Sequence, residues 1–563
     1  MNAAPVALLS IALFFFAYRL YGRWIARRLF EVSADRPVPS RENEDGIDFV
    51  PTNRYVLFGH HFASIAGAGP IVGPALAVIY GWLPALLWIL VGTIFVGAVH
   101  DIGSLLISIR HSGHTISDVT ETLMGRRARA ILVVVTFFLL LLVVAVFALV
   151  IAGLFKSYPE AVFPSAALVV IAISIGLLVY RVGVPLVPAT VIGVALMALS
   201  IWYGIGHPMG QNIGPMTWVV VLLAYAFVAS VLPVWLLLQP RDYLNSFGLY
   251  FGIGLTYLAL FAAHPRIVAP AVRATGAGAP PMIPFLFIIV ACGAISGFHS
   301  LISSGTTARQ LGSERDAAFV GYGSMLVEGA VAVMAVLACT AGLGSASSWA
   351  ERYQTWGAFG SLDAKLGAFI EGGDHLLQAL RFAPGIGGTL LTVIVVGFVL
   401  TSLDTASRLM RFTITELGES FGVKLLQNRY LASLIAVGSA FILATIKVGG
   451  KETGMMLWPA FGTTNQVFAS LVMIVISVYL LKFRKPVWPT VVPAAFMLAI
   501  TAAALVNQLG TWIREANWPL VGVGLIILGA ELWIAAEGTY TLLTIKKSTD
   551  TGLQLGLSDE SVT

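Results

Sequence analysis

The chain has 563 residues, of which 58% are hydrophobic and only 11% are charged, with a mean hydropathy of +0.88. A soluble domain carries about 25% charged residues, so this composition excludes a soluble protein and indicates many membrane-spanning helices. The net charge of +5 resides mostly in residues that flank apolar runs, which indicates orientation signals rather than nucleic-acid binding. Cys292 and Cys339 both lie in apolar runs, so neither a disulfide framework nor a thiolate metal cluster is expected.

An all-α polytopic fold of about fifteen spans follows if each crossing takes about 20 apolar residues. The first apolar run precedes a cluster of arginines instead of following one, which predicts a retained helix and not a signal peptide. If the loop after it is cytoplasmic, most Lys and Arg fall on that side, so we expect the N-terminus outside and the C-terminus inside. The expected spans lie near 3–21, 55–79, 82–109, 129–155, 162–180, 184–204, 216–238, 246–263, 282–305, 318–343, 387–408, 429–446, 454–481, 488–508 and 517–543.

The longest loop, about 344–384, is expected outside. Within it Leu362, Leu366, Phe369 and Ile370 share one helical face. Two interpretations remain open: a surface-lying helix or lid over an external vestibule, and a connecting helix packed on the bundle.

The stretch 59–74 is unlike an ordinary membrane helix, because an apolar run there contains His60, His61, four glycines and two prolines. Helix breaks at membrane depth are tolerated only where the freed backbone faces protein or a water-filled cavity. Broken helices of this kind line the binding sites of transporters. The stretch therefore predicts a broken helix at a binding site.

Three small residues accompany these histidines. Ser64 and Gly67 follow His60 at i+4 and i+7, which places a hydroxyl and a bare backbone on the same helical face. Gly67 and Gly69 do not indicate a dinucleotide site, because that fingerprint requires a βαβ unit and the flanks here are membrane-spanning. We interpret these glycines as points of backbone exposure and close helix approach.

The next span contains an ionisable pair, His100 and Asp101. The two spans are joined by a short turn around Gly81 and should form an antiparallel hairpin. His61 lies twenty residues before Gly81 and Asp101 twenty residues after it. With about 1.5 Å of rise per residue, the pair His60/His61 and the pair His100/Asp101 come to similar depth, so three imidazoles and a carboxylate can meet.

Three roles for these residues remain open. A His–Asp group lining a cavity can relay or store a proton, or contact the substrate. The set His61, His100 and Asp101 can also bind a zinc-like metal. In the third interpretation His60 or His61 only satisfies backbone groups freed by the glycine break.

A second polar seam lies in the span near 282–305, on one helical face. It provides either hydroxyl hydrogen bonds between helices or oxygen ligands for a substrate or a sodium-like cation. Arg309, just beyond it, either pairs with an anionic substrate or acts as an orientation anchor. The residues of this seam are Ser296, His299, Ser300, Ser303, Ser304 and Thr307.

Further polar residues occur in later spans. Ser402, Asp404 and Thr405 form a third seam, in which Asp404 and Arg408 stand at i and i+4 and can pair with each other. Glu328 is a lone acid in its span and a candidate proton carrier.

The seventh span and its end carry prolines and charges. Pro233 predicts a kink in mid-span. The residues Pro240, Arg241 and Asp242 are accounted for by helix termination at the cytoplasmic surface.

Four of these stretches, 59–70, 99–101, 237–244 and 401–405, resemble the carbon starvation protein A family. The resemblance implies an inner-membrane transporter, induced in carbon limitation, that takes up peptides or, in relatives, pyruvate with a proton. It also suggests a LeuT-like core of two inverted five-helix repeats around a broken first helix. The inverted mate of that helix is either the span with Pro233 or the serine-rich span; we favour the latter, because 401–405 then falls on the eighth core helix, where sodium-coupled relatives place cation-binding hydroxyls.

We therefore predict a secondary active transporter that is coupled to H⁺ or Na⁺ and is not an enzyme. Its expected partners are a small-molecule substrate, either a peptide or pyruvate, and the lipid bilayer. We expect no cofactor, no nucleic-acid partner and no evident protein partner. The rival hypothesis is an intramembrane metal-dependent enzyme that uses His60, His61, His100 and Asp101. The expected regions are an N-terminal helix with a basic cytoplasmic linker (1–50), a transporter core (51–482), two peripheral helices (483–547) and a disordered cytoplasmic tail (548–563).

Overall fold

The protein was analysed as a computed structural model that describes residues 1–273, 278–359, 362–445, 447–448, 451–452 and 458–550. Among these residues the regular structure is helical, apart from a two-residue pair of strands, β1 (Lys447–Val448) and β2 (Lys451–Glu452). The prediction of an all-α fold is therefore confirmed.

Eleven helical stretches in the described part of the chain are long and apolar enough to cross a membrane. This number makes the chain a multi-pass membrane protein. The stretches are α1 (Ala3–Ala17, continued by π-helical turns to Leu29), α5 (Trp82–Gly92) with α6 (Ala98–Ile109), α8 (Arg126–Ser157), α9 (Val162–Leu177), α10 (Leu186–Gly206), α12 (Leu238–Ala263), α15 (Gly323–Ala341), α18 (Ile386–Ser420), α21 (Trp458–Lys482), α22 (Trp488–Arg514) and α23 (Trp518–Asp550).

The other four expected spans are also helical but do not pass the same test alone. α3 (Arg54–Ala66) and α4 (Gly69–Ala77) form one bent span with an angle of 42°. α11 (Pro215–Val231) and α19 (Arg429–Thr445) are shorter apolar helices. The serine-rich span consists of two short helices, α13 (Met282–Ile289) and α14 (Gly297–Ile302), separated by residues 290–296.

The two interrupted spans contact each other at their breaks. Gly67 has a φ of +47°, which glycine adopts readily, and Pro70 follows the first residue of α4, a position that suits proline. A Cβ at Gly69 would lie 2.3 Å from Cys292 Sγ, and one at Gly73 would lie 2.4 Å from the carbonyl oxygen of Ile289. Glycine at these positions therefore permits the close approach of α4 to the break before α14.

The junction between α11 and α12 differs from the prediction. α11 ends at Val231, and Pro233 lies in the turn before α12 instead of kinking a span. Arg241 and Asp242 are the fourth and fifth residues of α12 and are buried, so they do not mark termination at a membrane surface. Proline lacks the amide hydrogen that continues a helix, which explains why the chain breaks here and starts again.

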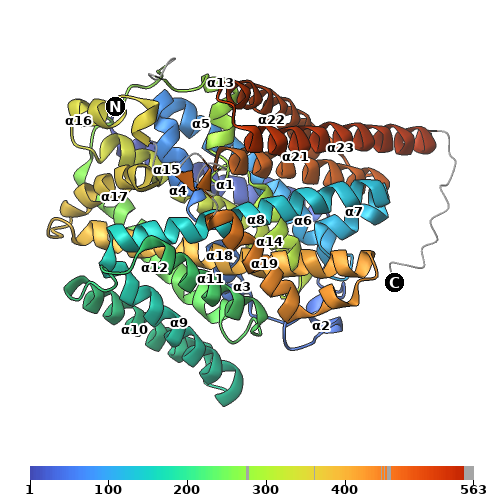
Figure 1. The fold of residues 1–563 in the computed structure, drawn as a ribbon, viewed down its shortest axis with the longest axis horizontal. Helices are drawn as coiled ribbons and strands as arrows, with labels where there is room; N and C mark the ends of the chain where they lie inside the picture. Colours follow the sequence, from blue (N-terminus) through green and yellow to red (C-terminus); the bar gives the residue numbers. More distant parts are fainter. Residues whose placement is uncertain (274–277, 360–361, 446, 449–450, 453–457, 551–563) are drawn as a thin grey trace.

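Two long helices, α8 and α18, pack against each other through the bundle. α3 packs on α12, and α14 packs on α21. α9 and α10 form a hairpin at the edge of the molecule, and α22 and α23 pack on α21 at another edge (Figure 1).

The loop near 344–384 contains α16 (Ala346–Arg352) and α17 (Leu362–Gln378). α17 packs on α15 and α18 and buries Leu366, Phe369 and Ile370. This agrees with a connecting helix packed on the bundle. The side chain of Leu362 lies outside the described residues.

At the C-terminus α23 continues to Asp550. Residues 548–550 are therefore helical and not disordered, and the rest of the expected tail lies outside the described residues.

The bundle has two ends. Asn2 forms a bridge with Arg266, and the turn at Gly81 lies against Ala271; we call this end the N-terminal face. The opposite end carries residues 31–53, which include α2 (Pro39–Glu42), and we call it the strap face. Figure 1 places the N-terminus near α16, on the other side of the molecule from α2.

Candidate functional site

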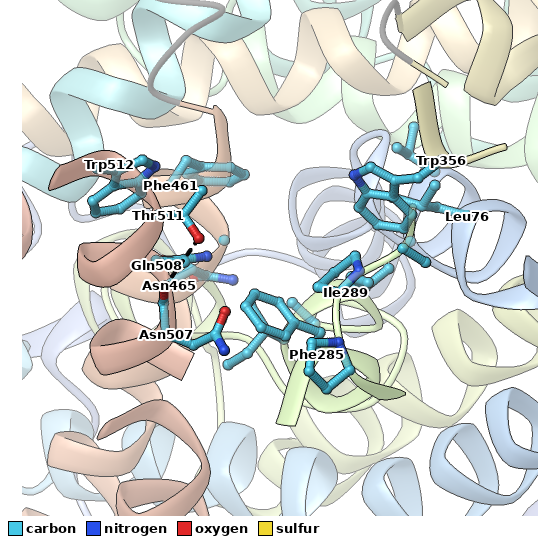
Figure 2. A pocket seen from close by; sticks show the side chains of 18 of the residues that line it. Leu76, Phe285, Ile289, Trp356, Phe461, Asn465, Asn507, Gln508, Thr511 and Trp512 are labelled. Atoms are coloured by element: carbon cyan, nitrogen blue, oxygen red, sulfur yellow. Dashed lines mark hydrogen bonds between the residues drawn. The ribbon is translucent and has the colours of Figure 1, made fainter. Parts of the chain in front are cut away.

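A cavity of about 760 Å³ lies between α4, α13, α21 and α22 and falls within the usual size range of ligand sites, about 300–1,000 Å³. It reaches the loops of the N-terminal face at residues 278–281 and Trp356. Figure 2 shows that the polar side chains lie on one wall, together with Phe461 and Trp512, and that the opposite wall is apolar. The polar wall contains Asn465, Asn507, Gln508 and Thr511, and the apolar wall contains Leu76, Phe285 and Ile289.

The breaks of both interrupted helices contribute to the cavity lining. Gly69 at the start of α4 and Cys292 in the break before α14 line it together with Asn465. The Asn465 side chain holds the second break in place, because its Oδ1 accepts from the backbone N–H of Phe298 at 2.8 Å and from Ser296 Oγ at 3.2 Å. The cavity therefore extends to the points where two membrane helices lose their regular backbone hydrogen bonds.

A buried group of ionisable side chains lies close to the second break; we call it the His299 cluster, formed by His299, Asp101, His100 and Glu328. His299 Nδ1 lies 3.1 Å from Asp101 Oδ2, and His299 Nε2 lies 3.4 Å from Glu328 Oε2. His100 Nδ1 lies 2.9 Å from the other Asp101 oxygen. All four side chains are fully buried, so one imidazole stands between two carboxyl groups from α6 and α15.

Several polar atoms in this cluster have no hydrogen-bond partner within the described part of the chain: both carboxyl oxygens of Glu328 and the Nε2 atoms of His100 and His299. Buried polar groups are normally hydrogen-bonded, and an exception calls for a functional explanation. Ionisable residues within a membrane are costly and mark ion or substrate pathways. Histidine can accept and release a proton, so an imidazole between two carboxyl groups is a candidate proton-binding site.

His61 and the serine seam lie beside this cluster. His61 Nδ1 is 2.7 Å from Thr307 Oγ1. The hydroxyls of Ser300 and Ser304 donate to backbone carbonyls one helical turn earlier, which favours helix packing as their role. Ser303 Oγ has no hydrogen-bond partner among the described residues.

A second buried group lies between α3, α12 and α18; we call it the Arg241 network. Arg241 forms an ion pair with Asp404 and contacts Asp242 at 3.0 Å. Tyr225 donates to Asp404 Oδ2 at 2.6 Å. His60 Nδ1 lies 2.6 Å from Asp242 Oδ2, so this network joins the first interrupted helix to α12 and α18.

Hydroxyl oxygens gather where α3 meets α18. Ser64 Oγ lies 3.1 Å from Thr405 Oγ1 and donates to Asp242 at 3.2 Å. Ser402 Oγ donates to the carbonyl oxygen of Ser64 at 3.0 Å. A Cβ at Gly67 would lie 2.8 Å from Ser402 Oγ, so this glycine permits the approach. Such oxygen donors are the ligands that hard cations prefer.

The structure divides the residues that the hairpin argument placed together: His61 lies beside the cluster that contains His100 and Asp101, whereas His60 belongs to the Arg241 network. His60 contacts Asp242 and His61 contacts Thr307, while His100 stays with Asp101. The residue spacing predicted depth but not rotation about the helix axis, which directs the two adjacent histidines to different neighbours. Among the described residues no group of three or more His, Cys, Asp or Glu side chains is arranged to hold a metal ion.

The predicted pairing of Asp404 with Arg408 is wrong. Asp404 turns to Arg241, whereas Arg408 contacts Asp48 at 2.5 Å and donates to the carbonyl oxygen of Ala229 at 2.9 Å. A buried guanidinium has five donors to satisfy, and a single carboxylate one turn away does not satisfy them all. Arg309 donates to the carbonyl oxygen of Gly113 at 3.1 Å.

Sequence reasoning did not identify Tyr225 and Asn465 as residues of these groups, and it gave Arg241 and Asp242 no functional role. Arg241 and Asp242 were attributed to a helix end, although two adjacent charges beside apolar runs were a usable signal. Asn465 lies in a short polar segment, residues 463–466, within an apolar run, and nothing in the sequence showed which helix it faces.

Many membrane helices, two of them interrupted beside a shared cavity and buried ionisable groups, define a polytopic membrane protein built like a transporter. The chain belongs to the carbon starvation protein CstA family, whose family model matches residues 2–348 and 362–504. This confirms the family predicted from the motifs.

Its relatives are named as transporters and not as enzymes. The peptide transporter CstA of Campylobacter jejuni is 35% identical and is covered over 79% of its length by 89% of this chain. The pyruvate/proton symporter BtsT of Escherichia coli is 33% identical, with 81% of its length and 90% of this chain covered. The peptide transporter CstA of Bacillus subtilis is 32% identical, with 91% of both chains covered.

Two solved structures are also similar. MhsT in complex with L-phenylalanine has a TM-score of 0.46 at 11% identity, over 87% of this chain and 99% of that one. A mutant of the Eremococcus coleocola manganese transporter has a TM-score of 0.44 at 13% identity, over 89% of this chain and 99% of that one.

Proposed function

We propose that this protein is a secondary active transporter that imports a small carbon source, a peptide or pyruvate, across the bacterial inner membrane. The observation that carries the proposal is the cavity that ends at the breaks of two interrupted helices. One of these breaks continues directly into α14, which holds His299. Cys339, the second cysteine, is buried in packed helix.

We propose further that the core consists of two inverted repeats of five spans. The first repeat is α3/α4, α5–α6, α8, α11 and α12, and the second is α13/α14, α15, α18, α19 and α21. Each repeat then starts with an interrupted helix, and each interrupted helix packs on the last helix of its own repeat. If the serine-rich span α13/α14 is the inverted mate of α3/α4, two helices must be inserted in the first repeat, and the hairpin α9–α10 is this insertion.

The orientation of the proposal follows the charge distribution. The N-terminal face lies outside and the strap face is cytoplasmic, because Lys and Arg concentrate in the loops of the latter. The cavity then opens outward, as an importer requires in the state that captures its substrate. The relatives named as peptide transporters and as a pyruvate/proton symporter leave both substrate classes to be tested.

Two sites are candidates for coupling. Proton coupling would use the His299 cluster, where His299 stands between Asp101 and Glu328. Coupling to a cation such as Na⁺ would use the oxygens of Ser64, Ser402 and Thr405. The rival hypothesis of a metal-dependent enzyme is not supported by any cluster of metal-ligating side chains in the described part of the chain.

The test is uptake of labelled pyruvate and of labelled di- and tripeptides into proteoliposomes under imposed proton or sodium gradients. The proposal expects accumulation of one substrate class under one gradient. Asp101→Asn should remove accumulation driven by a proton gradient, and Thr405→Val should remove accumulation driven by a sodium gradient. If neither class accumulates under either gradient, the proposal fails.

A further inference from the structure

Residues 31–53, which we call the strap, cross the strap face of the bundle and bind several helix ends. Thr52 N–H donates to the carbonyl oxygen of Gln310 at 3.0 Å, and Ser40 Oγ donates to that of Leu311 at 2.6 Å. These contacts tie the strap to the segment that follows the second interrupted helix. Gln239 of α12 donates to Thr52 Oγ1 at 2.8 Å.

The strap is also tied to the junction between α11 and α12. Val234 N–H donates to the carbonyl oxygen of Ile47 at 2.9 Å, and the indole of Trp235 donates to that of Gly46 at 3.1 Å. The turn of the strap is held in shape at this point, because Asp45 Oδ1 accepts hydrogen bonds from the backbone N–H groups of three successive residues, 47–49.

Asp48 projects from this turn toward α18. Its carboxylate lies 2.5 Å from Arg408 Nη1 and 3.0 Å from Arg411 Nη2. Charge-assisted hydrogen bonds of this kind are about twice as strong as neutral ones. The arginine side chains are nearly or fully buried, and Asp48 itself is only 13% exposed, so the contacts are shielded from the screening that weakens surface ion pairs.

We place the two interrupted helices in one moving bundle and α18 outside it, so the strap joins two parts that alternating access separates. Segment 309–311 follows the second interrupted helix, whereas Arg408 and Arg411 belong to the long helix α18. Alternating access moves one repeat or bundle against another around a fixed site. A segment bonded to both sides holds their ends together while the cavity is open at the other face.

We propose that the strap is the inner gate of this transporter and that Asp48 is its latch, a positioning residue that holds the pathway closed by binding Arg408 and Arg411. The inference rests on the proposed transport function, since a gate has meaning only for a pathway. Inward opening then requires the Asp48 contacts to break.

The test places a thiol under the strap. Leu311 is fully buried, and Leu311→Cys in a Cys292→Ser, Cys339→Ser background reports exposure of this segment to a membrane-impermeant maleimide added at the strap face of oriented vesicles. We expect Asp48→Asn to raise the labelling rate about tenfold or more, as loss of a charge-assisted pair predicts. Arg411→Gln, which weakens the latch from α18, should act in the same direction.

Asp35→Asn is the matched control, because Asp35 lies in the same strap and its carboxylate accepts only from neighbouring Ser33 in the hydrogen bonds observed. It should leave the labelling rate unchanged. The latch is overturned if Asp48→Asn and Arg411→Gln both label as slowly as the parent, or if Asp35→Asn labels as fast as they do. Labelling requires no transport, so failure of the gate is distinguished from failure of uptake in the parent protein.

Discussion

The two halves of the molecule are built differently around the same interrupted helices. Toward the N-terminal face a cavity of about 760 Å³ lies between α4, α13, α21 and α22, and one of its walls carries neutral amide and hydroxyl groups. Toward the strap face buried ion pairs join α12 to α18 in the Arg241 network and join the strap to α18 at Asp48. The difference teaches that buried charge pairs hold helices together toward the strap face, whereas most residues that line the cavity are uncharged, apart from Arg514 and Glu515.

The largest expected effect is on the free energy of unfolding, after a substitution in the Arg241 network toward the strap face. Arg241→Met leaves Asp242 and Asp404 buried without their guanidinium partner, and breaking a buried pair in this way costs about 3–5 kcal/mol. We expect the free energy of unfolding in detergent to fall by about that amount. Arg315→Met, at an exposed position on the strap face, should change it by less than about 0.5 kcal/mol. Equal effects of the two substitutions would contradict the role given to the network.

The next effect concerns the His299 cluster. Asp101→Asn removes the carboxylate that faces both His100 and His299, and hydrogen bonds to charged groups contribute about 1.5–3 kcal/mol, equivalent to about tenfold or more. We expect proton-driven accumulation to fall by at least about tenfold, while exchange of labelled for unlabelled substrate across the membrane persists. Asp316→Asn, at the strap face, is the control. Retention of driven uptake by Asp101→Asn would assign the cluster a packing role.

A smaller effect concerns the polar wall of the cavity. Gln508 lies on α22, outside the proposed ten-helix core, and its Oε1 accepts from Thr463 at 3.0 Å. Loss of one neutral hydrogen bond is worth about 0.5–1.5 kcal/mol, so Gln508→Ala should raise the KM for uptake about 2- to 10-fold with little change in the maximal rate. Val506→Ala, on the exposed side of the same helix, should leave KM unchanged. An unchanged KM in Gln508→Ala would exclude α22 from the substrate path.

The smallest expected effect is that of pH on the latch. Burial tends to raise the pKa of the Asp48 carboxyl, but Arg408 and Arg411 outweigh it and hold the pKa at about 2, below the value of about 3.9 in an unfolded chain. A lowered pKa stabilises the folded contact at every pH above about 5 and loses this contribution only as the pH falls toward 2. Labelling of Leu311→Cys, normalised to the unfolded protein, should therefore stay constant between about pH 5 and 8. A rise toward pH 5 would show that another group controls the strap.

Much of this arrangement could be predicted from the sequence, and the rest could not for identifiable reasons. Apolar length located helices at every expected span, and the glycines and histidines of 59–74 predicted the break at Gly67. The second break, at 290–296, lay in the span favoured as the inverted mate. It was not predicted as a break, because no proline interrupts it and a glycine such as Gly293 also suits helix packing.

The sequence did not predict which side chains on other helices the buried polar residues contact. Hairpin counting gave the depth of His60 and His61 but not the directions of their rings, so their contacts with Asp242 and Thr307 were not predicted. The i, i+4 spacing predicted that Asp404 pairs with Arg408 on the same helix. In the structure Asp404 instead contacts Arg241 and Tyr225 on other helices. The strap was identified only as a charged linker, because its function depends on which helix ends lie beneath it.

The most direct test of the difference between the two halves uses a thiol already present. Cys292 is partly exposed in the cavity, whereas Cys339 is buried. In membrane vesicles of defined orientation, with Cys339→Ser to assign the signal, Cys292 should react with an impermeant maleimide added at the N-terminal face and not at the strap face, and a transported substrate should slow the reaction. Labelling from the strap face, or labelling that no transported substrate slows, would contradict a substrate cavity that opens at one face and is closed at the other.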